Sequence, residues 1–435
     1  MSKNEKIVLI GAGSLQFGLG SVGNILESKI LEGATICLHD INAENLNLAY
    51  KACQAAIEER KLDFTIDSTI YRTDALKNAT FIINAIEVAP RFELLELDYR
   101  IPQEYGCKQV TGENGGPGGL FHSLRVIPPI LDICQDVMKI CPDAYFINFS
   151  NPMSRICLAI KRKFPSLKFV GLCHEYYHFS ALLSRILQTP LSNLDVIGGG
   201  LNHFGVILDI KYRDTGKDAY DDLRKKGPEF LYALQTYDGF KLIGFLLETY
   251  GYCPYTTDSH YGEYIKWAWE YADIRAIRQF WKEYAYSLDK NFKKTKKYIE
   301  KGKGAKVVKP DEESAIPIIE GIISDSNHVE PSVNISNNGI ITNLPQDLVV
   351  ECPAVINKDG ITGIKLGEYP KGIAALLMTQ ASVQDLVVEA IFKRSKKLAL
   401  QALLADPVVE TYWQANKILN ELLKLEKDYI QIELE

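Results

Sequence analysis

Lys6–Ile10 (KIVLI) is an apolar run that leads directly into Gly11-Ala12-Gly13-Ser14 (GAGS), near the start of the 435-residue chain. Apolar residues then recur with helical spacing at Leu15, Leu19, Val22 and Leu26. A strand that turns through glycines into a helix lets a pyrophosphate approach the backbone N–H groups at the positive end of the helix. The stretch therefore predicts a dinucleotide-binding turn, with Gly11, Gly13 and Ser14 at the phosphates.

Asp40 closes a second apolar run, Thr35–Leu38. A carboxylate at this point accepts hydrogen bonds from an adenosine ribose and repels a 2′-phosphate, so Asp40 favours NAD over NADP. Three further apolar runs each lead into a polar loop: Phe81–Ala85, Tyr145–Phe149 and Phe169–Leu172. Strands that alternate with helical segments predict an α/β fold with a doubly wound, Rossmann-type parallel sheet.

The length of the chain exceeds the roughly 250–300 residues at which single cores stop growing. We expect an NAD-binding Rossmann-type domain at residues 1–195 and a mixed α+β domain at residues 196–435. The net charge of −6 gives no basic footprint for nucleic acid. The sequence shows no membrane span or signal peptide, and its nine scattered cysteines predict free thiols, so we expect a cytoplasmic protein.

Residues 112–119 (GENGGPGG) contain five glycines, more than a simple turn needs. They predict a mobile lid or a backbone that approaches a ligand closely, with an ordinary flexible loop as the alternative. Further along, Asn148 and Asn151 (NFSNPM, 148–153) lie past the carboxyl end of a predicted strand, where open α/β sheets bind ligands.

Cys173, His174 and Glu175 follow the next predicted strand, and His203 lies in a glycine-rich GGGLNHF segment (198–204). Taken separately, Cys173 and His203 read as a buried thiol and a core histidine. Together, a thiolate and an imidazole could bind a divalent metal and leave positions open for substrate. The segment Asp258–Tyr264 (DSHYGEY) has five ionisable side chains in seven residues, and it is either a surface loop or a source of proton-transfer groups.

These motifs, in this order and followed by NNGI (337–340), VECP (350–353) and LLADPVV (403–409), resemble family-4 glycoside hydrolases over nearly the whole chain. That family is an NAD-dependent exception to two-carboxylate glycoside hydrolysis. The resemblance implies a lactate/malate dehydrogenase-like fold. It also implies hydrolysis by C3 oxidation with NAD, C2 deprotonation, elimination, water addition and re-reduction.

The resemblance assigns roles to individual residues. Cys173 and His203 match the metal ligands, for Mn²⁺ or another divalent metal such as Co²⁺ or Ni²⁺. Asp258 or Tyr264 would be the C2 base, and His174 would assist the leaving group. Asn148 is expected on the nicotinamide side. The side chains expected at the sugar are Asn151, Asn202, Glu113 and His260. The second domain would then carry the metal, substrate and oligomerisation surfaces of a homodimer or homotetramer.

The Cys-His-Glu form resembles family members that act on unphosphorylated α-glycosides, which implies such a glycoside as the small-molecule substrate. Within the same mechanism the alternative is an α-uronidase (galacturonidase or glucuronidase), in which Arg91, Arg125 or Lys266 would meet an anionic C6 group. The alternative class is a malate/lactate-type NAD dehydrogenase with net hydride transfer. A third reading is a non-catalytic nucleotide sensor, which would need no Cys173–His203 pair.

Overall fold

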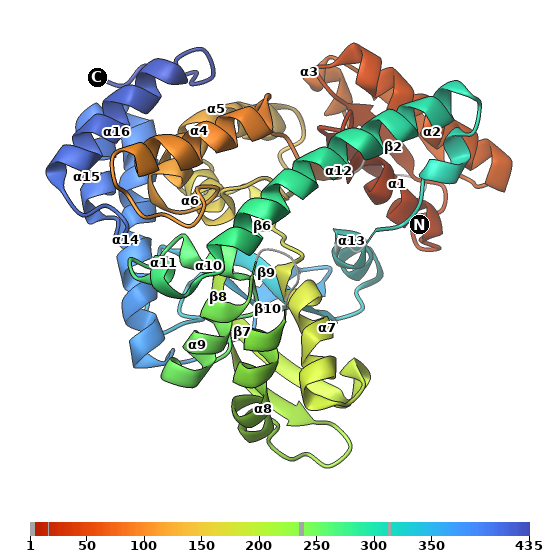
Figure 1. Cartoon of the computed structure of the whole chain (residues 1–435). Coiled ribbons are helices and arrows are strands. Elements are labelled where there is room, and N and C mark those ends of the chain that lie inside the picture. Colours follow the sequence, from red (N-terminus) through yellow and green to blue (C-terminus); the bar gives the residue numbers. More distant parts are fainter. Residues whose placement is uncertain (1–4, 16, 235–238, 312–314) are drawn as a thin grey trace.

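The computed structural model describes residues 5–15, 17–234, 239–311 and 315–435 (Figure 1). Its first half is a sheet of six parallel strands in the order β3-β2-β1-β4-β5-β6. These strands are β1 (Lys6–Ile10), β2 (Thr35–His39), β3 (Thr65–Thr69), β4 (Phe81–Asn84), β5 (Tyr145–Asn148) and β6 (Lys168–Gly171). The five predicted strands and the parallel, doubly wound arrangement are confirmed. Only β3 was not foreseen from its sequence.

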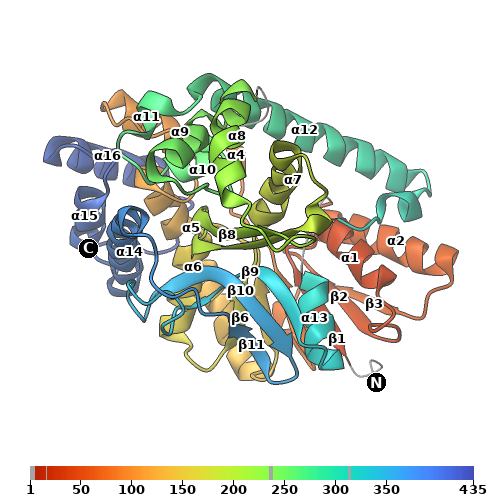
Figure 2. The same ribbon diagram turned by 90° about the horizontal axis from the view of Figure 1, so that it is seen from below.

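Five strands of the second half extend the same sheet in mostly antiparallel fashion, in the order β6-β9-β10-β7-β8, with β11 paired to β10 (Figure 2). They are β7 (Leu194–Leu201), β8 (Phe204–Tyr212), β9 (His328–Ser336), β10 (Val349–Asn357) and β11 (Gly360–Gly363). The predicted domain boundary at residue 195 therefore falls inside β7. The two halves share one continuous sheet.

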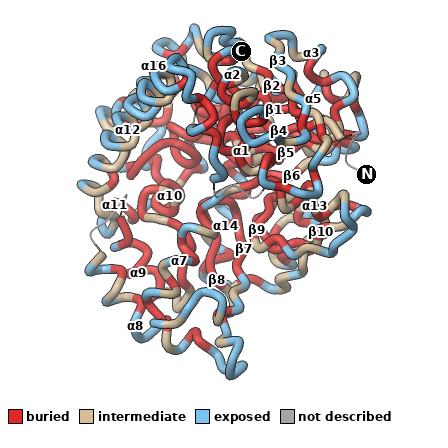
Figure 3. Tube along the Cα trace, turned by 90° about the vertical axis from the view of Figure 1, so that its right-hand side faces the viewer, coloured by how far each residue is buried: buried red, intermediate tan, exposed pale blue. Residues whose placement is uncertain are grey.

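Helices cover both faces of the parallel strands. Ile7 and Leu9 of β1 belong to one buried cluster, and Val8 and Ile10 belong to another on the opposite face. β1, β4 and β5 are coloured mostly as buried in Figure 3, whereas β3, at the end of the sheet, is largely exposed. The first cluster takes side chains from α1 (Phe17–Glu27), α2 (Ala43–Arg60), α7 (Glu175–Leu187), α8 (Tyr220–Ala233), α9 (Lys241–Tyr250), α10 (Asp258–Gly262), α11 (Ala268–Tyr271), α12 (Ile274–Glu300) and α13 (Ala315–Ser324).

The second cluster joins the two ends of the chain. It takes side chains from α3 (Arg72–Ala75), α4 (Arg91–Glu104), α5 (Gly116–Ile140), α6 (Met153–Lys163), α15 (Lys396–Ala405) and α16 (Tyr412–Leu425), while α14 (Lys371–Lys393) contributes to both clusters. Two short 3-10 helices, η2 (Leu191–Asn193) and η3 (Gly304–Val307), complete the described elements. Because the last three helices pack on α4, α5 and α6, the predicted second domain completes the core of the first.

The glycine-rich loop is not an exposed lid. Residues 110–119 are all buried, and α5 begins within the loop at Gly116. A Cβ on Gly118 would lie 2.4 Å from the backbone oxygen of Gly112, and one on Gly115 would lie 2.7 Å from the backbone oxygen of Glu263. The glycines therefore allow the loop to fold tightly on itself and on the segment that carries Glu263 and Tyr264.

Among the described residues, α14 alone is long and apolar enough to cross a membrane. Half of its most apolar stretch is buried within the fold. Core helices of globular domains pass the same test, so this is weak evidence for a membrane span.

Candidate active site

The GAGS turn packs so closely against neighbouring atoms that a side chain would clash at two of its positions. Gly11 has a φ of +90°, and a Cβ there would lie 2.8 Å from the backbone oxygen of Ala85. A Cβ on Gly13 would lie 2.6 Å from Oδ2 of Asp40, which accepts a hydrogen bond from the Gly13 N–H at 2.7 Å. The turn leads into α1, which has no acidic residue in its first turn to oppose a phosphate. This arrangement fits a dinucleotide pyrophosphate, with Asp40 beside the loop.

Gly18 supplies the close contact that a third glycine gives in a dinucleotide loop. A Cβ at Gly18 would lie 2.5 Å from the backbone oxygen of Ala12. The first turn of α1 can therefore press against the loop. The third glycine comes two positions later than in the usual GxGxxG spacing, yet it performs the same packing.

Cys173 and His203 come together at the edge of the sheet. Cys173 lies just past β6, and His203 lies in the turn between β7 and β8, with a φ of +60°. The sulfur of Cys173 is 3.3 Å from Nε2 of His203. Sulfur and nitrogen ligands of one zinc-sized ion are about 3.1–3.6 Å apart, for bond lengths of roughly 2.3 and 2.05 Å at angles between 90° and 109°. The pair therefore fits a divalent metal and leaves further positions open.

Electrostatics favour the metal-binding form of His203 and the protonated form of Cys173. Burial, helped by the nearby His260 and His174, lowers the pKa of His203 well below its usual value, so the imidazole is neutral. Burial and the carboxylates of Glu351 and Glu175 raise the pKa of Cys173 well above its usual value. A thiolate here needs a neighbouring cation, as metal binding supplies by displacing the thiol proton.

His260 and Glu175 extend the pair outward. The His260 ring stacks on the His203 ring with 4.1 Å between centroids. Nε2 of His260 lies 3.8 Å from Oε1 of Glu175, whose other oxygen accepts a hydrogen bond from Thr256 at 2.7 Å. Although burial opposes ionisation, His260 and His174 lower the pKa of Glu175, so a carboxylate stands between the two imidazoles.

The glycine-rich loop contributes Glu113 and Asn114 to the same place. Glu113 accepts a hydrogen bond from Arg91 at 2.9 Å, and its second oxygen accepts one from the Asn114 side chain at 3.1 Å. Nδ2 of Asn114 also lies 3.1 Å from Nδ1 of His203. Asn114 therefore joins the expected sugar contact Glu113 to the expected metal ligand His203.

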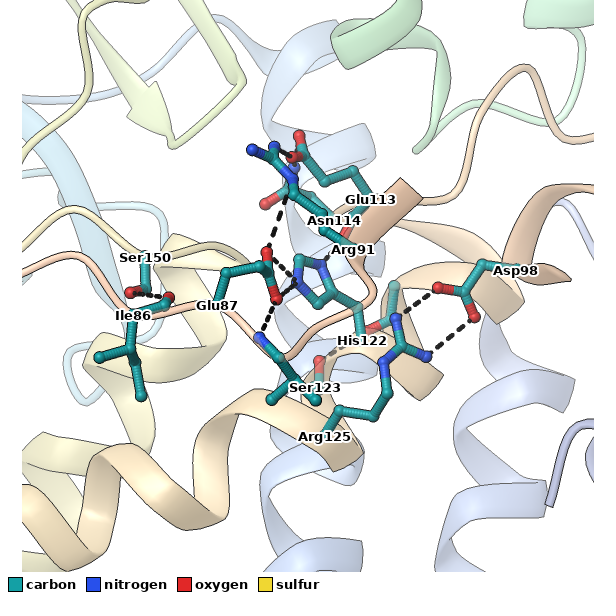
Figure 4. Close-up of polar contacts among 12 residues, drawn as sticks. Ile86, Glu87, Arg91, Asp98, Glu113, Asn114, His122, Ser123, Arg125 and Ser150 are labelled. Carbon is teal, nitrogen blue, oxygen red and sulfur yellow. Dashed lines mark hydrogen bonds and ion pairs between the residues drawn. The ribbon is translucent and has the colours of Figure 1, made fainter. Parts of the chain in front are cut away.

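Glu87 and His122 support this arrangement from behind (Figure 4). Nδ1 of His122 is 2.7 Å from the Glu113 backbone oxygen, and its Nε2 is 3.2 Å from the Glu87 carboxylate. Burial opposes ionisation of Glu87, but His122 and Arg91 prevail and lower the pKa of Glu87 to about 2. Neither Glu87 nor His122 was predicted. The only signal was the position of Glu87 just past β4, at the edge where the other site residues gather.

Tyr264 and Glu263 lie on the opposite side of the loop. The backbone N–H groups of Asn114 and Gly115 both donate hydrogen bonds to Oε2 of Glu263. The Tyr264 ring packs on Phe204 with 4.7 Å between centroids. Burial and the carboxylates of Glu263 and Glu113 raise the pKa of Tyr264 well above its usual value, while Arg155 lowers it. Tyr264 is thus a buried hydroxyl within the electrostatic reach of Glu113 and Cys173.

Two family models divide the chain between them. The model described as family 4 glycosyl hydrolase matches residues 6–189, and the model of its C-terminal domain matches residues 199–409. The chain belongs to family 4 of the glycosyl hydrolases. It is thus a glycoside hydrolase, in agreement with the resemblance drawn from its motifs.

The relatives of this family-4 chain include an alpha-glucosidase from Erwinia rhapontici, which is 44% identical over 93% of this chain and 94% of its own length. An alpha-galactosidase from Bacillus subtilis is 30% identical and covers 93% of both chains. The crystal structure of a 6-phospho-alpha-glucosidase from gut microorganisms, in complex with NAD and Mn²⁺, superposes with a TM-score of 0.86 at 21% identity, covering 99% of this chain and 100% of that one.

A malate dehydrogenase from Plasmodium falciparum superposes less well. Its TM-score is 0.51 at 16% identity, over 89% of this chain and 99% of that one. The dehydrogenase-like fold predicted from the sequence is confirmed by this likeness. The family models exclude the simple malate/lactate dehydrogenase class.

Asp258 does not face the Cys173–His203 pair as a C2 base would. Its side chain is wholly buried, and its two oxygens accept hydrogen bonds from the backbone N–H groups of Lys241 (3.0 Å), Ile243 (3.2 Å) and Asp273 (2.9 Å). These donors lie at the N-terminal ends of α9 and α12. Asp258 therefore fixes two helices, which argues against its predicted role as the C2 base.

Asn148 and Asn202 also act inside the protein. The side chain of Asn148 is wholly buried; it accepts from Asn84 and donates to the Ser150 backbone oxygen, both at 2.9 Å. It therefore shapes the loop after β5, and its contact with the nicotinamide stays a prediction. Asn202 donates to the buried Glu351 carboxylate at 2.9 Å, which holds its side chain in place, and its contact with the sugar stays a prediction.

The remaining predicted residues lie at the accessible side. Asn151 is half-buried beyond β5, at the same edge as Cys173, because β5 and β6 are parallel neighbours. The side chain of His174 is 45% exposed, and its Nε2 is 3.7 Å from Oε1 of Glu175. Both are therefore placed where a ligand could reach them.

Proposed function

We propose that this family-4 chain hydrolyses an unphosphorylated α-glucoside, with NAD and Mn²⁺ as cofactors. The observation that carries the proposal is the Cys173–His203 pair, 3.3 Å apart and surrounded by Glu113, His260 and Tyr264 at the edge of a dinucleotide-binding sheet. The 44% identical alpha-glucosidase supports glucose as the sugar.

The charges around the pair support a neutral sugar. Glu113 lies beside His203 and His260, and Glu175 lies beside His260, so a phosphate or uronate would meet the repulsion of two carboxylates. Each of the three basic residues considered for an anionic C6 group already has carboxylate partners. Arg91 pairs with Glu113 and Glu87, Arg125 pairs with Asp98 and Glu426 in the core, and the exposed Lys266 lies 3.7 Å from Glu410.

When bound, NAD supplies a reversible hydride acceptor for C3 of the sugar, and Mn²⁺ supplies the Lewis acid that acidifies the C2 proton. Cys173 and His203 would hold the metal, and Gly11, Gly13, Ser14 and Asp40 would hold the dinucleotide. Removal of the C2 proton expels the glycosidic oxygen from C1. Addition of water at C1, a proton at C2 and return of the hydride to C3 would then complete a hydrolysis without net oxidation.

Tyr264 is the proposed acceptor of the C2 proton. What supports it over Asp258 is that the oxygens of Asp258 are taken by three backbone N–H groups, whereas Tyr264 is within electrostatic reach of Glu113 and Cys173. Burial raises the pKa of Tyr264 well above its usual value, and the positive charge of the buried Arg155 opposes that rise. Glu113 would bind sugar hydroxyls with Arg91 holding its carboxylate, and the exposed His174 would protonate the leaving oxygen.

A panel of chromogenic glycosides tests the proposal. Purified protein would be assayed with NAD, Mn²⁺ and a thiol reductant, because an oxidised Cys173 is a poor metal ligand. We expect the highest kcat/KM for the α-glucoside, lower values for the α-galactoside, and little turnover of the 6-phosphate or the α-galacturonoside. A preference for either anionic substrate would contradict the neutral-sugar assignment.

We also propose a cytoplasmic location and a homodimer or homotetramer. The cytoplasmic location is supported by an active site that needs Cys173 as a reduced thiol. The oligomeric state is supported by the family resemblance. Gel filtration with light scattering would measure the mass of the assembly, and a monomer would contradict the second proposal.

A further inference from the structure

A second group of metal-binding side chains lies beside the Cys173–His203 pair and has no part in it. Residues 174–178 read His-Glu-Tyr-Tyr-His, which places two histidines four positions apart with a glutamate after the first. The segment forms the start of α7, and the His178 N–H bonds to the His174 backbone oxygen at 3.0 Å, so a regular helical turn joins them. Histidines at positions i and i+4 of a helix project from one face, as in the zinc-binding H-E-x-x-H pattern.

The side chains are already gathered. The rings of His174 and His178 are 4.5 Å apart between centroids. One ligand atom from each of His174, Glu175 and His178 lies within 4.8 Å of the other two. Ligands of one tetrahedral zinc are about 3.3–3.5 Å apart, given metal–ligand distances of roughly 2.0–2.2 Å. Small side-chain rotations would therefore bring the three donors onto one ion.

The group is distinct from the first pair in position and chemistry. His174 and His178 are exposed, whereas His203 is buried. Cys173 faces His203, so the second group holds no thiol. Glu175 stands between the two, with Oε1 3.7 Å from His174 and 3.8 Å from His260. His174 is the proposed acid for the leaving oxygen, but His178 has no role in the proposed reaction, so hydrolysis does not explain why a second histidine stands beside His174.

We infer that His174, Glu175 and His178 form a second metal site, at the solvent-facing edge of the active site, that binds Zn²⁺. Two imidazoles and one carboxylate are a common zinc donor set, with water completing the coordination. Imidazole ligands favour zinc over manganese at such a site. The full protein would thus hold two divalent ions, one at the thiolate–imidazole pair and one at the two-histidine site. This inference rests on the proposed function in one respect: zinc on His174 would prevent that imidazole from protonating the leaving oxygen and would therefore inhibit hydrolysis.

Zinc stoichiometry tests the inference. The full-length protein would be stripped of metal, dialysed against buffered Zn²⁺, and analysed for zinc per chain. We expect two ions in the unmodified protein, one in His178→Gln and one in Cys173→Ser. His328→Gln is the matched control, because His328 is also partly exposed and pairs with a glutamate at 3.2 Å but lies on β9. It should hold two.

Cobalt spectra provide a readout that loss of folding cannot imitate. Co²⁺ at the Cys173–His203 pair should give thiolate charge-transfer absorption, and Co²⁺ at the second site should give only the visible bands of nitrogen and oxygen ligands. His178→Gln should keep the first signal and lose the second. One zinc per chain in the unmodified protein, or two in His178→Gln, would overturn the inference.

Discussion

The two ends of the segment from Asp258 to Tyr264 face different parts of the molecule. Asp258 turns toward the N-terminal ends of α9 and α12 and binds their backbone. Tyr264 turns toward Phe204, Glu113 and the Cys173–His203 pair. Both are buried ionisable residues and both looked suitable for proton transfer. What separates them is the partner each meets, and those partners lie on other elements of the fold.

The largest expected effect is on activity, and it comes from Tyr264. Tyr264→Phe removes the hydroxyl but keeps the ring packed on Phe204, so kcat should fall by about 10²–10⁴-fold, as when a general base is lost. Metal affinity and the unfolding midpoint should stay unchanged. The measurement is kcat with the α-glucoside in steady-state assays.

Tyr261→Phe is the matched control for that loss. Tyr261 is also wholly buried and packs on Phe204 at 4.5 Å, and its hydroxyl has no hydrogen-bond partner among the described residues. Its kcat should change less than about threefold, since only an unpaired hydroxyl is removed. Equal losses in the two variants would mean that the phenol of Tyr264 matters only for packing.

Substitution of Asp258 should change the stability of the protein. In Asp258→Asn, an amide N–H would face backbone N–H groups whose hydrogen bonds the carboxylate accepts in the unmodified protein. We expect the free energy of unfolding to fall by about 2–4 kcal/mol, since hydrogen bonds to a charged group contribute roughly 1.5–3 kcal/mol. Urea denaturation measures this, while activity per folded molecule should persist. A stable but inactive Asp258→Asn protein would instead return Asp258 to the chemistry.

Glu263, between the two ends, should control a pH dependence. Burial and the Glu113 carboxylate raise the pKa of Glu263 to about 8, from an ordinary value of 4.5. The unfolded chain therefore releases this proton at lower pH than the folded chain. Stability from Glu263 is complete below pH 4.5 and is lost progressively as the pH rises to about 8.

Glu263→Gln tests that dependence. A glutamine oxygen can still accept from the N–H groups of Asn114 and Gly115, but it cannot ionise. The decline of the unfolding midpoint between pH 5 and pH 8 should therefore become shallower than in the unmodified protein. Parallel curves for the two proteins would show that Glu263 does not hold its proton in the folded state.

The smallest effect is expected just beyond the segment. Lys266 is exposed and 3.7 Å from Glu410, a pair worth less than about 0.5 kcal/mol. Lys266→Ala should leave the unfolding free energy and the ratio of neutral to anionic substrate turnover unchanged. A selective loss of activity on an α-galacturonoside would show that Lys266 meets a C6 carboxylate.

Much of the nucleotide half could be predicted because its signals are local. The KIVLI run, the glycines after it and Asp40 lie within 35 residues of sequence, and the structure joins Gly13 to Asp40 directly. β3 (TIDST) escaped because it is a polar strand at the edge of the sheet with no apolar run. The boundary at residue 195 falls between the two family models, but the continuous sheet was not predicted, because pairing of β6 with β9 cannot be read from either strand alone.

The active site depends on contacts between distant segments. Asn114 meets His203 and Glu263 from 89 and 149 residues away. The approach of Cys173 to His203 could be predicted because both residues match metal ligands in the family that the motifs resemble, and the structure places their side chains 3.3 Å apart. Carboxylates and amides have many uses, so Glu87, Glu263 and Glu351 were missed and the roles of Asp258 and Asn148 required the structure.

The most direct test of the account is the fate of the C2 hydrogen during hydrolysis in deuterium oxide. The α-glucoside would be hydrolysed with NAD and Mn²⁺ present, NADH absorbance would be followed, and the sugar released would be analysed by NMR. We predict one solvent deuterium at C2 of the product and no accumulation of NADH. Product that keeps its original hydrogen at C2 would contradict the proposed elimination, and with it the role of Tyr264.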